Sequence, residues 1–177
     1  MTTGGSKQTA VDESVVQEHI AGVLEAFNSH DADRFVALMT EDVVFDHSAS
    51  PTTMRGRAEV RSFYADNTWK AVPDVRLELD DGPFLHPHAP RYSVAWRAVG
   101  THTGPIDPPG FAPTGKRIEF PVWEISELRD GRASRVRIAI DMADVMRQLG
   151  LLAAPGSRAE RAMATLQRLQ MKVSRRR

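Results

Sequence analysis

The spacing of apolar residues changes once along this chain, near Pro73, from the period of a helix to the alternation of a strand. Before Pro73, apolar residues recur every three or four positions in residues 12–29 and 57–69, which is typical of helices that bury one face. After Pro73, four segments have the pattern of strands: residues 75–79, 91–101, 117–128 and 134–141. Helices followed by a run of strands favour an α+β fold over a parallel βαβ fold.

The region between the first and third helices completes the expected architecture. Asp31 is a capping residue that predicts the start of a second helix, with an inner face formed by Phe35, Leu38 and Met39. The β-branched run at 43–47 predicts a strand, and residues 48–56 a loop. We therefore expect a cone, in which three amphipathic helices pack on one curved antiparallel sheet and leave an apolar pocket between the two layers.

The length of 177 residues predicts a single domain, which we place at residues 12–152. The polar residues 1–11 are expected to be disordered, and they lack the apolar run of a signal peptide. Residues 153–177 are expected to form a basic helix and tail, with a frayed end at 175–177 and an apolar stripe made of Ala162, Met163, Leu166, Leu169 and Val173. The Pro- and Gly-rich loop at 104–115 is long enough to border a binding site.

The charged residues exclude several classes of function. Residues 155–177 carry seven basic side chains and one acidic one, which leaves the rest of the chain with a formal charge of −6. This distribution is not that of a nucleic-acid-binding fold. No apolar run is long enough to span a membrane, and the absence of cysteine excludes disulfides and thiolate catalysis. We expect a cytoplasmic protein without nucleic-acid or membrane partners.

Several stretches resemble a known family. EAFNSHDADRFVALMTEDVVF, at 25–45, resembles the opening of the nuclear-transport-factor-2-like fold. Four further segments resemble the SnoaL-like polyketide cyclase branch of that fold: GTHTGPI (100–106), PTGKRIEF (113–120), WEISELRDGR (123–132) and IDMADVMRQLGLL (140–152). The resemblance implies closure of a ring in an aromatic polyketide by an intramolecular aldol reaction, without a metal or an organic cofactor.

The resemblance also implies a carboxylate, usually Asp, as general acid/base on the last strand, with a His on the neighbouring strand. This chain departs from that pattern. The position of the acid/base holds Ile138, and the position of the His falls at Trp123 or Glu124. The Asp and His that the resemblance implies are therefore absent from these two positions.

Glu124 is the candidate that strand alternation offers instead. In residues 117–128 it shares one face with the apolar Ile118, Phe120 and Val122, so we expect it to point into the pocket. Apolar surroundings disfavour the charged form of a carboxyl group, which would suit Glu124 to exchange a proton near neutral pH. The alternative is that Glu124 lies at the rim and pairs with an arginine such as Arg137.

Further candidates lie at the ends of the expected elements. His47 and Asp46 end the first strand, at a corner that we expect to face the pocket, and His102 could orient a substrate carbonyl or bond within its own turn. Asp141 stands where the last strand gives way to a helix, so it is either an N-cap or an acid at the mouth of the pocket. Substrate contacts are expected from Tyr64, Asp46, Phe63, Phe120, Val122 and Ile138.

The sequence leaves two classes of function open. The first is a cofactor-independent enzyme that transfers protons on a small, hydrophobic, polyketide-like substrate, by cyclisation or by dehydration, isomerisation or hydroxylation. The second is a non-catalytic ligand-binding or accessory protein with the same fold, which the isoleucine at 138 favours. His86 and His88 lack a third ligand nearby in the sequence, so we expect no metal site. An exposed sheet face, with Trp123 on it, predicts a homodimer.

Overall fold

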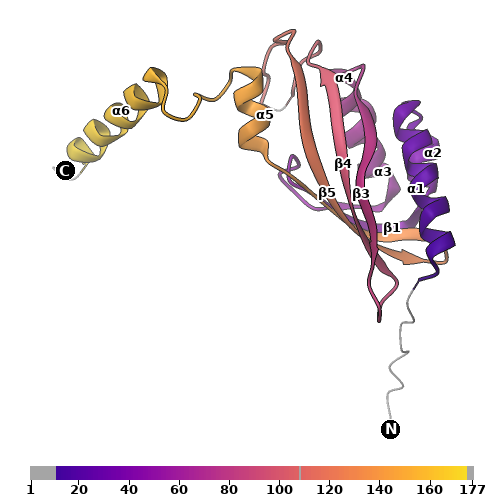
Figure 1. Ribbon diagram of the computed structural model, residues 1–177. Coiled ribbons are helices and arrows are strands. Elements are labelled where there is room, and N and C mark those ends of the chain that lie inside the picture. Colours follow the sequence, from indigo (N-terminus) through magenta and orange to yellow (C-terminus); the bar gives the residue numbers. More distant parts are fainter. Residues whose placement is uncertain (1–10, 108, 175–177) are drawn as a thin grey trace.

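The computed structural model of the protein describes residues 11–107 and 109–174 (Figure 1). Residues 1–10 and 175–177, on which we had placed a disordered start and a frayed end, lie outside the described part. The elements from the amino-terminal half are α1 (Glu13–Asn28), α2 (Ala32–Ala37), β1 (Met39–His47), β2 (Met54–Arg55), α3 (Gly56–Ser62), the π-helical turn η1 (Phe63–Thr68) and α4 (Trp69–Ala71). The rest are β3 (Arg76–Leu85), β4 (Arg91–Thr101), β5 (Arg117–Arg129), β6 (Arg132–Ile140), α5 (Met142–Leu149) and α6 (Arg158–Ser174).

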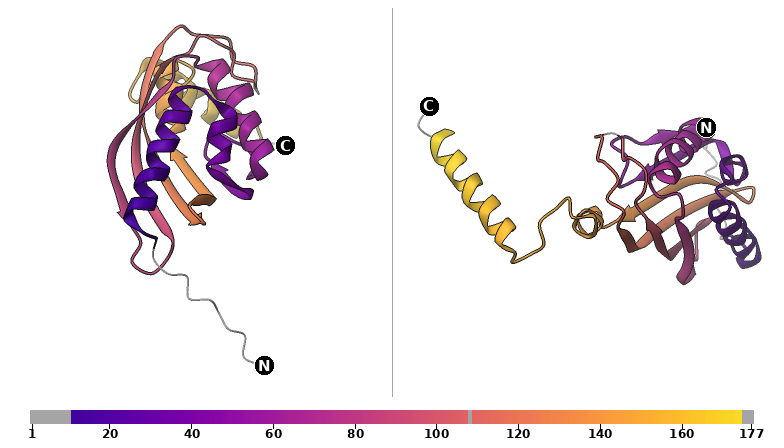
Figure 2. Two further views of the ribbon diagram at one scale, coloured as in Figure 1. Left: turned by 90° about the vertical axis from the view of Figure 1, so that its right-hand side faces the viewer. Right: turned by 90° about the horizontal axis from the view of Figure 1, so that it is seen from above.

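The fold is the expected α+β cone, with a six-stranded sheet in the order β2-β1-β6-β5-β4-β3. Helices α1, α2 and α3 lie on one side of the curved sheet (Figures 1 and 2). Helix α6 extends away from the rest of the chain in both figures, and its side chains of Met163, Leu166 and Met171 are exposed.

Capping side chains fix where the first two helices begin. The Asp12 carboxylate accepts a hydrogen bond from the Ser14 amide at 2.8 Å, and the Asp31 carboxylate accepts one from the Arg34 amide at 2.9 Å. Between the helices His30 has a φ of 55°, a left-handed conformation that turns the chain sharply. These local bonds orient both helices so that their apolar faces meet the sheet.

The structure corrects three details of the expected fold. Met39 starts β1 instead of ending the second helix, and Met54 and Arg55 form the short strand β2 inside the expected loop. The sheet is not antiparallel throughout, because β1 runs parallel to β6, with His47 opposite Ile138. Pairing between distant strands depends on tertiary packing, which the local pattern of side chains does not encode.

The alternation of buried and exposed side chains agrees with the predicted faces of the strands. On β5, Ile118, Val122 and Glu124 are buried while Trp123 is 58% exposed on the opposite face. On β6, Val136 and Ile138 are buried and Arg135 and Arg137 are exposed. The concave face of the sheet is therefore the apolar one, and it faces the helices.

Candidate active site

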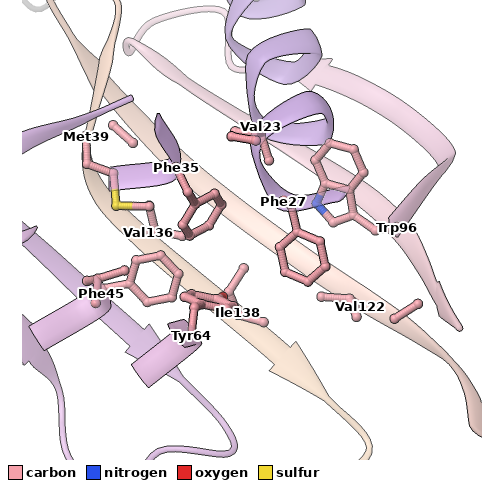
Figure 3. Packing of buried hydrophobic residues seen from close by; sticks show 14 of the residues in the cluster. Val23, Phe27, Phe35, Met39, Phe45, Tyr64, Trp96, Val122, Val136 and Ile138 are labelled. Atoms are coloured by element: carbon pink, nitrogen blue, oxygen red, sulfur yellow. The ribbon is translucent and has the colours of Figure 1, made fainter. Parts of the chain in front are cut away.

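A cavity of about 390 Å³ lies between the concave face of the sheet and the helices. Figure 3 shows a part of its wall, where aromatic rings from the helices face aliphatic side chains of the strands. All the residues labelled there line the cavity: Val23, Phe27, Phe35, Met39, Phe45, Tyr64, Trp96, Val122, Val136 and Ile138. The wall is overwhelmingly apolar, which is the usual character of a site for a small organic ligand.

The carboxylate of Glu124 is held in this apolar wall by three hydrogen bonds. Oε1 accepts from the Tyr92 hydroxyl at 2.9 Å and from the Ser126 hydroxyl at 2.5 Å, and Oε2 accepts from the Trp96 indole at 2.9 Å. Glu124 is only 7% exposed. Sequence reasoning correctly placed this side chain on the inner face. Its partners are these three neutral donors, and not Arg137 as the alternative held.

The carboxylate also acts on the other titratable groups around it. Burial and the charge of Glu124 both raise the pKa of Tyr64 and of Tyr92. Burial lowers the pKa of His19, while Glu124 acts in the opposite direction. At neutral pH both tyrosines are therefore protonated donors and His19 is a neutral imidazole.

Strand register places Glu124 and His47 on either side of Ile138. Glu124 pairs with Ile138 between β5 and β6, and Ile138 pairs with His47 between β6 and β1. Neighbouring strands lie about 4.8 Å apart, so the backbones of Glu124 and His47 are separated by roughly 10 Å. The position at which the family resemblance implies an acid/base therefore holds an apolar side chain, and it lies between Glu124 and His47 in the sheet.

His47 joins the cavity wall through its ring. Its Nδ1 accepts a hydrogen bond from the Ala49 amide at 3.0 Å, and its ring lies 4.9 Å from that of Phe63. Burial lowers the pKa of His47 to about 4. Because Nδ1 is occupied as an acceptor, the neutral ring carries its proton on Nε2, from which it can donate a hydrogen bond.

His102 follows the end of β4, eight residues beyond Val94, the residue paired with Glu124. Its backbone amide bonds Lys116 rather than a residue near Glu124, and its Nδ1 contacts the hydroxyl and the amide of Thr114 at 3.1 and 3.2 Å. Nε2 of His102 is buried without a partner among the described residues. The ring therefore bonds within its own loop, as one of the two interpretations held, while it also lines the cavity.

Asp141 and Asp46 are placed outside the cavity wall. The Asp141 carboxylate accepts a hydrogen bond from the Asp144 amide at 3.0 Å and caps α5. Asp46 alternates with His47 and so faces away from the cavity; it accepts a hydrogen bond from Thr53 at 2.6 Å and lies 3.6 Å from Arg135. Neither carboxylate is among the cavity-lining groups.

Apart from Asp46, the expected substrate contacts line one cavity. Tyr64, Phe63, Phe120, Val122 and Ile138 all contribute to its wall. The π-helical turn widens the helix at this point and carries Phe63, Tyr64, Asn67 and Thr68 to the wall. Turns of this type often occur at functional sites, because the extra residue redirects the side chains that follow it.

Sequence reasoning missed His19 and Tyr92 as members of the site, and it did not connect Trp96, which it weighed as a stacking, core or interface residue, with Glu124. His19 follows Val16 by three residues and precedes Val23 by four, so its position on the apolar stripe of α1 was a signal that could have found it. Tyr92 and Trp96 had the pattern of core residues. Their contact with Glu124 depends on the β4–β5 register, which places Val94 opposite Glu124.

The described residues show neither a metal cluster nor a membrane span. Within 11–107 and 109–174, no group of three or more His, Cys, Asp or Glu side chains is arranged to hold a metal ion. No helix in this part of the chain is both long enough and apolar enough to cross a membrane.

The chain belongs to the SnoaL-like polyketide cyclase family, whose model matches residues 17–149. Among solved structures, TsrD from Streptomyces laurentii is 24% identical with a TM-score of 0.67, and the match covers 80% of this chain and 99% of TsrD. IdmH from Streptomyces antibioticus, described as a candidate polyketide cyclase, is 27% identical with a TM-score of 0.62, and the match covers 76% of this chain and 97% of IdmH.

AclR from Streptomyces galilaeus, described as a candidate hydroxylase, shares the fold at 20% identity and a TM-score of 0.67, with 80% of this chain and 100% of AclR covered. No curated protein matches the sequence. The family membership and these neighbours establish a cone of the nuclear-transport-factor-2-like type.

Proposed function

We propose that this protein is a cofactor-independent, polyketide cyclase-like enzyme that transfers protons on a small, hydrophobic, polyketide-derived substrate. The observation that carries the proposal is the buried carboxylate of Glu124, which is fixed by three donors in the wall of an otherwise apolar cavity. A charge in such a place is costly unless it is used or compensated, and titratable groups in apolar clefts are typical of acid/base sites.

The site has the groups that an aldol ring closure needs. A proton leaves the carbon next to one carbonyl, the resulting enolate attacks a second carbonyl of the same molecule, and the new alkoxide takes up a proton. Glu124 and the side chains around it would carry out the proton transfers. Tyr64 and His47 line the same cavity, and the hydroxyl of Tyr64 and Nε2 of His47 would donate hydrogen bonds to the enolate and alkoxide oxygens.

The experiment is to incubate the protein with a linear or partly cyclised aromatic polyketide ester and to follow the product by chromatography and mass spectrometry. Glu124→Gln keeps the shape of the side chain but removes its charge, so we expect the rate to fall by about 10²-fold or more. Glu119→Gln is the matched control, because Glu119 lies on the outer face of the same strand and pairs with Arg97. Equal rates for both variants would contradict the proposal.

The isoleucine at the position of the family acid/base favours a second candidate, a non-catalytic ligand-binding protein with the same cavity. Binding of the polyketide ester without conversion would support that role. Product analysis also separates the related reactions, because dehydration loses water, hydroxylation gains oxygen, and cyclisation and isomerisation keep the mass but change the retention time.

We also propose that the protein forms a homodimer through the outer face of the sheet. Trp123, Ile125 and Phe84 are 58%, 45% and 54% exposed there, and strand register places them beside the small residues Ala95 and Ser93. Both signs of charge surround them, with Arg137 beside Ile125 and Glu119 further along β5. A patch with an apolar centre and mixed charges at its edge is suited to pairing with its own copy around a two-fold axis.

A further inference from the structure

His19 is a buried imidazole in the cavity wall to which the proposed reaction has so far assigned no part. It lies on α1, is 4% exposed and lines the cavity. Its ring meets that of Tyr92 edge-on, with the ring centroids 6.1 Å apart. Tyr92 donates directly to Glu124, so His19 belongs to the immediate surroundings of the carboxylate.

One nitrogen of this ring has an unfilled bonding position. Nδ1 of His19 is buried and has no hydrogen-bond partner among the described residues. Nearly all buried polar atoms in folded proteins are bonded, so an exception calls for a role. Burial keeps this ring neutral, and in the tautomer that carries its proton on Nε2 the lone pair of Nδ1 is free to accept a second proton.

Glu124 also has bonding capacity left. An ionised carboxylate offers about four acceptor positions, of which Oε1 uses two and Oε2 uses one. The remaining position is on Oε2, the oxygen that Trp96 approaches. The carboxylate group therefore has one acceptor position left with which it could stabilise a positive charge on a nearby imidazole.

We propose that Nδ1 of His19 accepts the proton that the substrate loses, and that the carboxylate of Glu124 stabilises the imidazolium that forms. The carbon–hydrogen bond of the substrate breaks, its electron pair passes into the enolate, and the proton forms a new N–H bond at Nδ1. After ring closure the same proton returns to the alkoxide, so His19 and Glu124 end the cycle as they began. This inference rests on the proposed use of the cavity for proton transfer.

The electrostatics of the pair are consistent with this division of roles. Burial is the largest influence on His19 and lowers its pKa, so the ring is neutral and able to accept a proton at pH 7. The charge of Glu124 raises the pKa of His19 and thereby favours the imidazolium. Tyr64 and Tyr92, the other titratable groups beside Glu124, are kept protonated by burial and by the same charge.

A reaction that needs no natural substrate can test the base. In 5-nitrobenzisoxazole a base removes the proton on C3 while the N–O bond breaks, which gives a coloured cyanophenolate. We expect wild-type protein to accelerate this elimination and His19→Asn to slow it by about 10²-fold. In Glu124→Gln the rate should fall. The pH at which the base becomes active should also shift downwards, because the charge of Glu124 no longer raises the pKa of His19.

The controls separate a catalytic role from a structural one. His88→Asn makes the same change at an exposed loop position outside the cavity and should leave the rate unchanged. Free imidazole should restore part of the rate to His19→Ala, which a merely misfolded variant would not show. Circular dichroism checks the fold, and the pH profile of Glu124→Gln does not depend on whether His19 variants fold.

Two results would overturn the inference. If Glu124→Gln abolishes the elimination while His19→Asn retains it, Glu124 accepts the proton itself, and the proposed function stands without this role for His19. If His19→Asn equals the wild type, Nδ1 is not the base. Failure of the polyketide assay with a normal response in the elimination assay would reject the proposed function and leave His19 as the base of the cavity.

Discussion

Glu124 illustrates how one polar side chain is accommodated in an apolar row of a strand. Its neighbours on the inner face of β5, Val122 and Ile118, are buried and aliphatic. The cost of burying a charge is offset only when hydrogen bonds replace those lost from water. Tyr92, Trp96 and Ser126 supply these bonds, so the stability of the cone and the state of its candidate catalytic group depend on the same contacts.

This coupling predicts different effects for two buried tyrosines. Tyr92→Phe removes a hydrogen bond to a buried carboxylate, so the free energy of unfolding should fall by about 1.5–3 kcal/mol. The Tyr64 hydroxyl is not one of the three donors to Glu124, so Tyr64→Phe should cost less. Urea unfolding at pH 7 measures both. Equal losses would show that the Tyr92 hydroxyl contributes no more than that of Tyr64.

Among the elements, α5 connects the last strand to one end of the cavity. Met142, Val145, Met146 and Leu149 of this helix contribute to the cavity wall, and Asp141 caps its first turn. Gly150 ends the helix with a φ of 78°, a left-handed conformation that glycine adopts without strain. The helix is short, so its position depends on these two ends as well as on packing.

Substitutions at Asp141 distinguish its cap from an acid role. Asp141→Ala should lower the free energy of unfolding by about 1 kcal/mol, and Asp141→Asn should cost less because asparagine caps about as well as aspartate. Chemical denaturation measures these changes, and the polyketide assay measures turnover. A large loss of turnover in Asp141→Asn with unchanged stability would mean that the charge acts in the reaction and that capping is not its main role.

For the molecule as a whole, the two faces of the sheet differ in what they contact. The concave face encloses the cavity, while the outer face leaves Trp123 and Ile125 in contact with solvent. Isolated exposed apolar residues are ordinary, but a cluster on a flat sheet face is typical of an interface. The proposed dimer would cover this cluster without closing the cavity, which lies on the other side of the sheet.

The proposed dimer predicts that charges on the outer face produce monomers. Trp123→Lys and Ile125→Lys should each shift the mass measured by light scattering after size exclusion from that of a dimer to that of a monomer. Leu79→Lys is the control, because Leu79 is 44% exposed but shares the inner face of the sheet edge with Trp96, its partner in register. A wild-type protein that is monomeric at all concentrations would contradict the dimer.

Local patterns in the sequence were enough to predict the succession of helices and long strands, the inner and outer faces of those strands, and the apolar character of the cavity. Helical and strand periodicities are local, so the inward direction of Glu124 and the exposure of Trp123 followed from alternation within β5 alone. Likewise Asp31 and Asp141 could be recognised as caps, because the amides that they bond lie three residues further along the chain.

The surroundings of Glu124, in contrast, arise from long-range packing. Its donors Tyr92 and Trp96 are 32 and 28 residues away in the chain, and the parallel pairing of β1 with β6 is what sets His47 beside Ile138. His19 reaches the same place from α1. Such contacts depend on how strands choose partners and how helices pack on them, and those choices are made by the whole core rather than by any local run of residues.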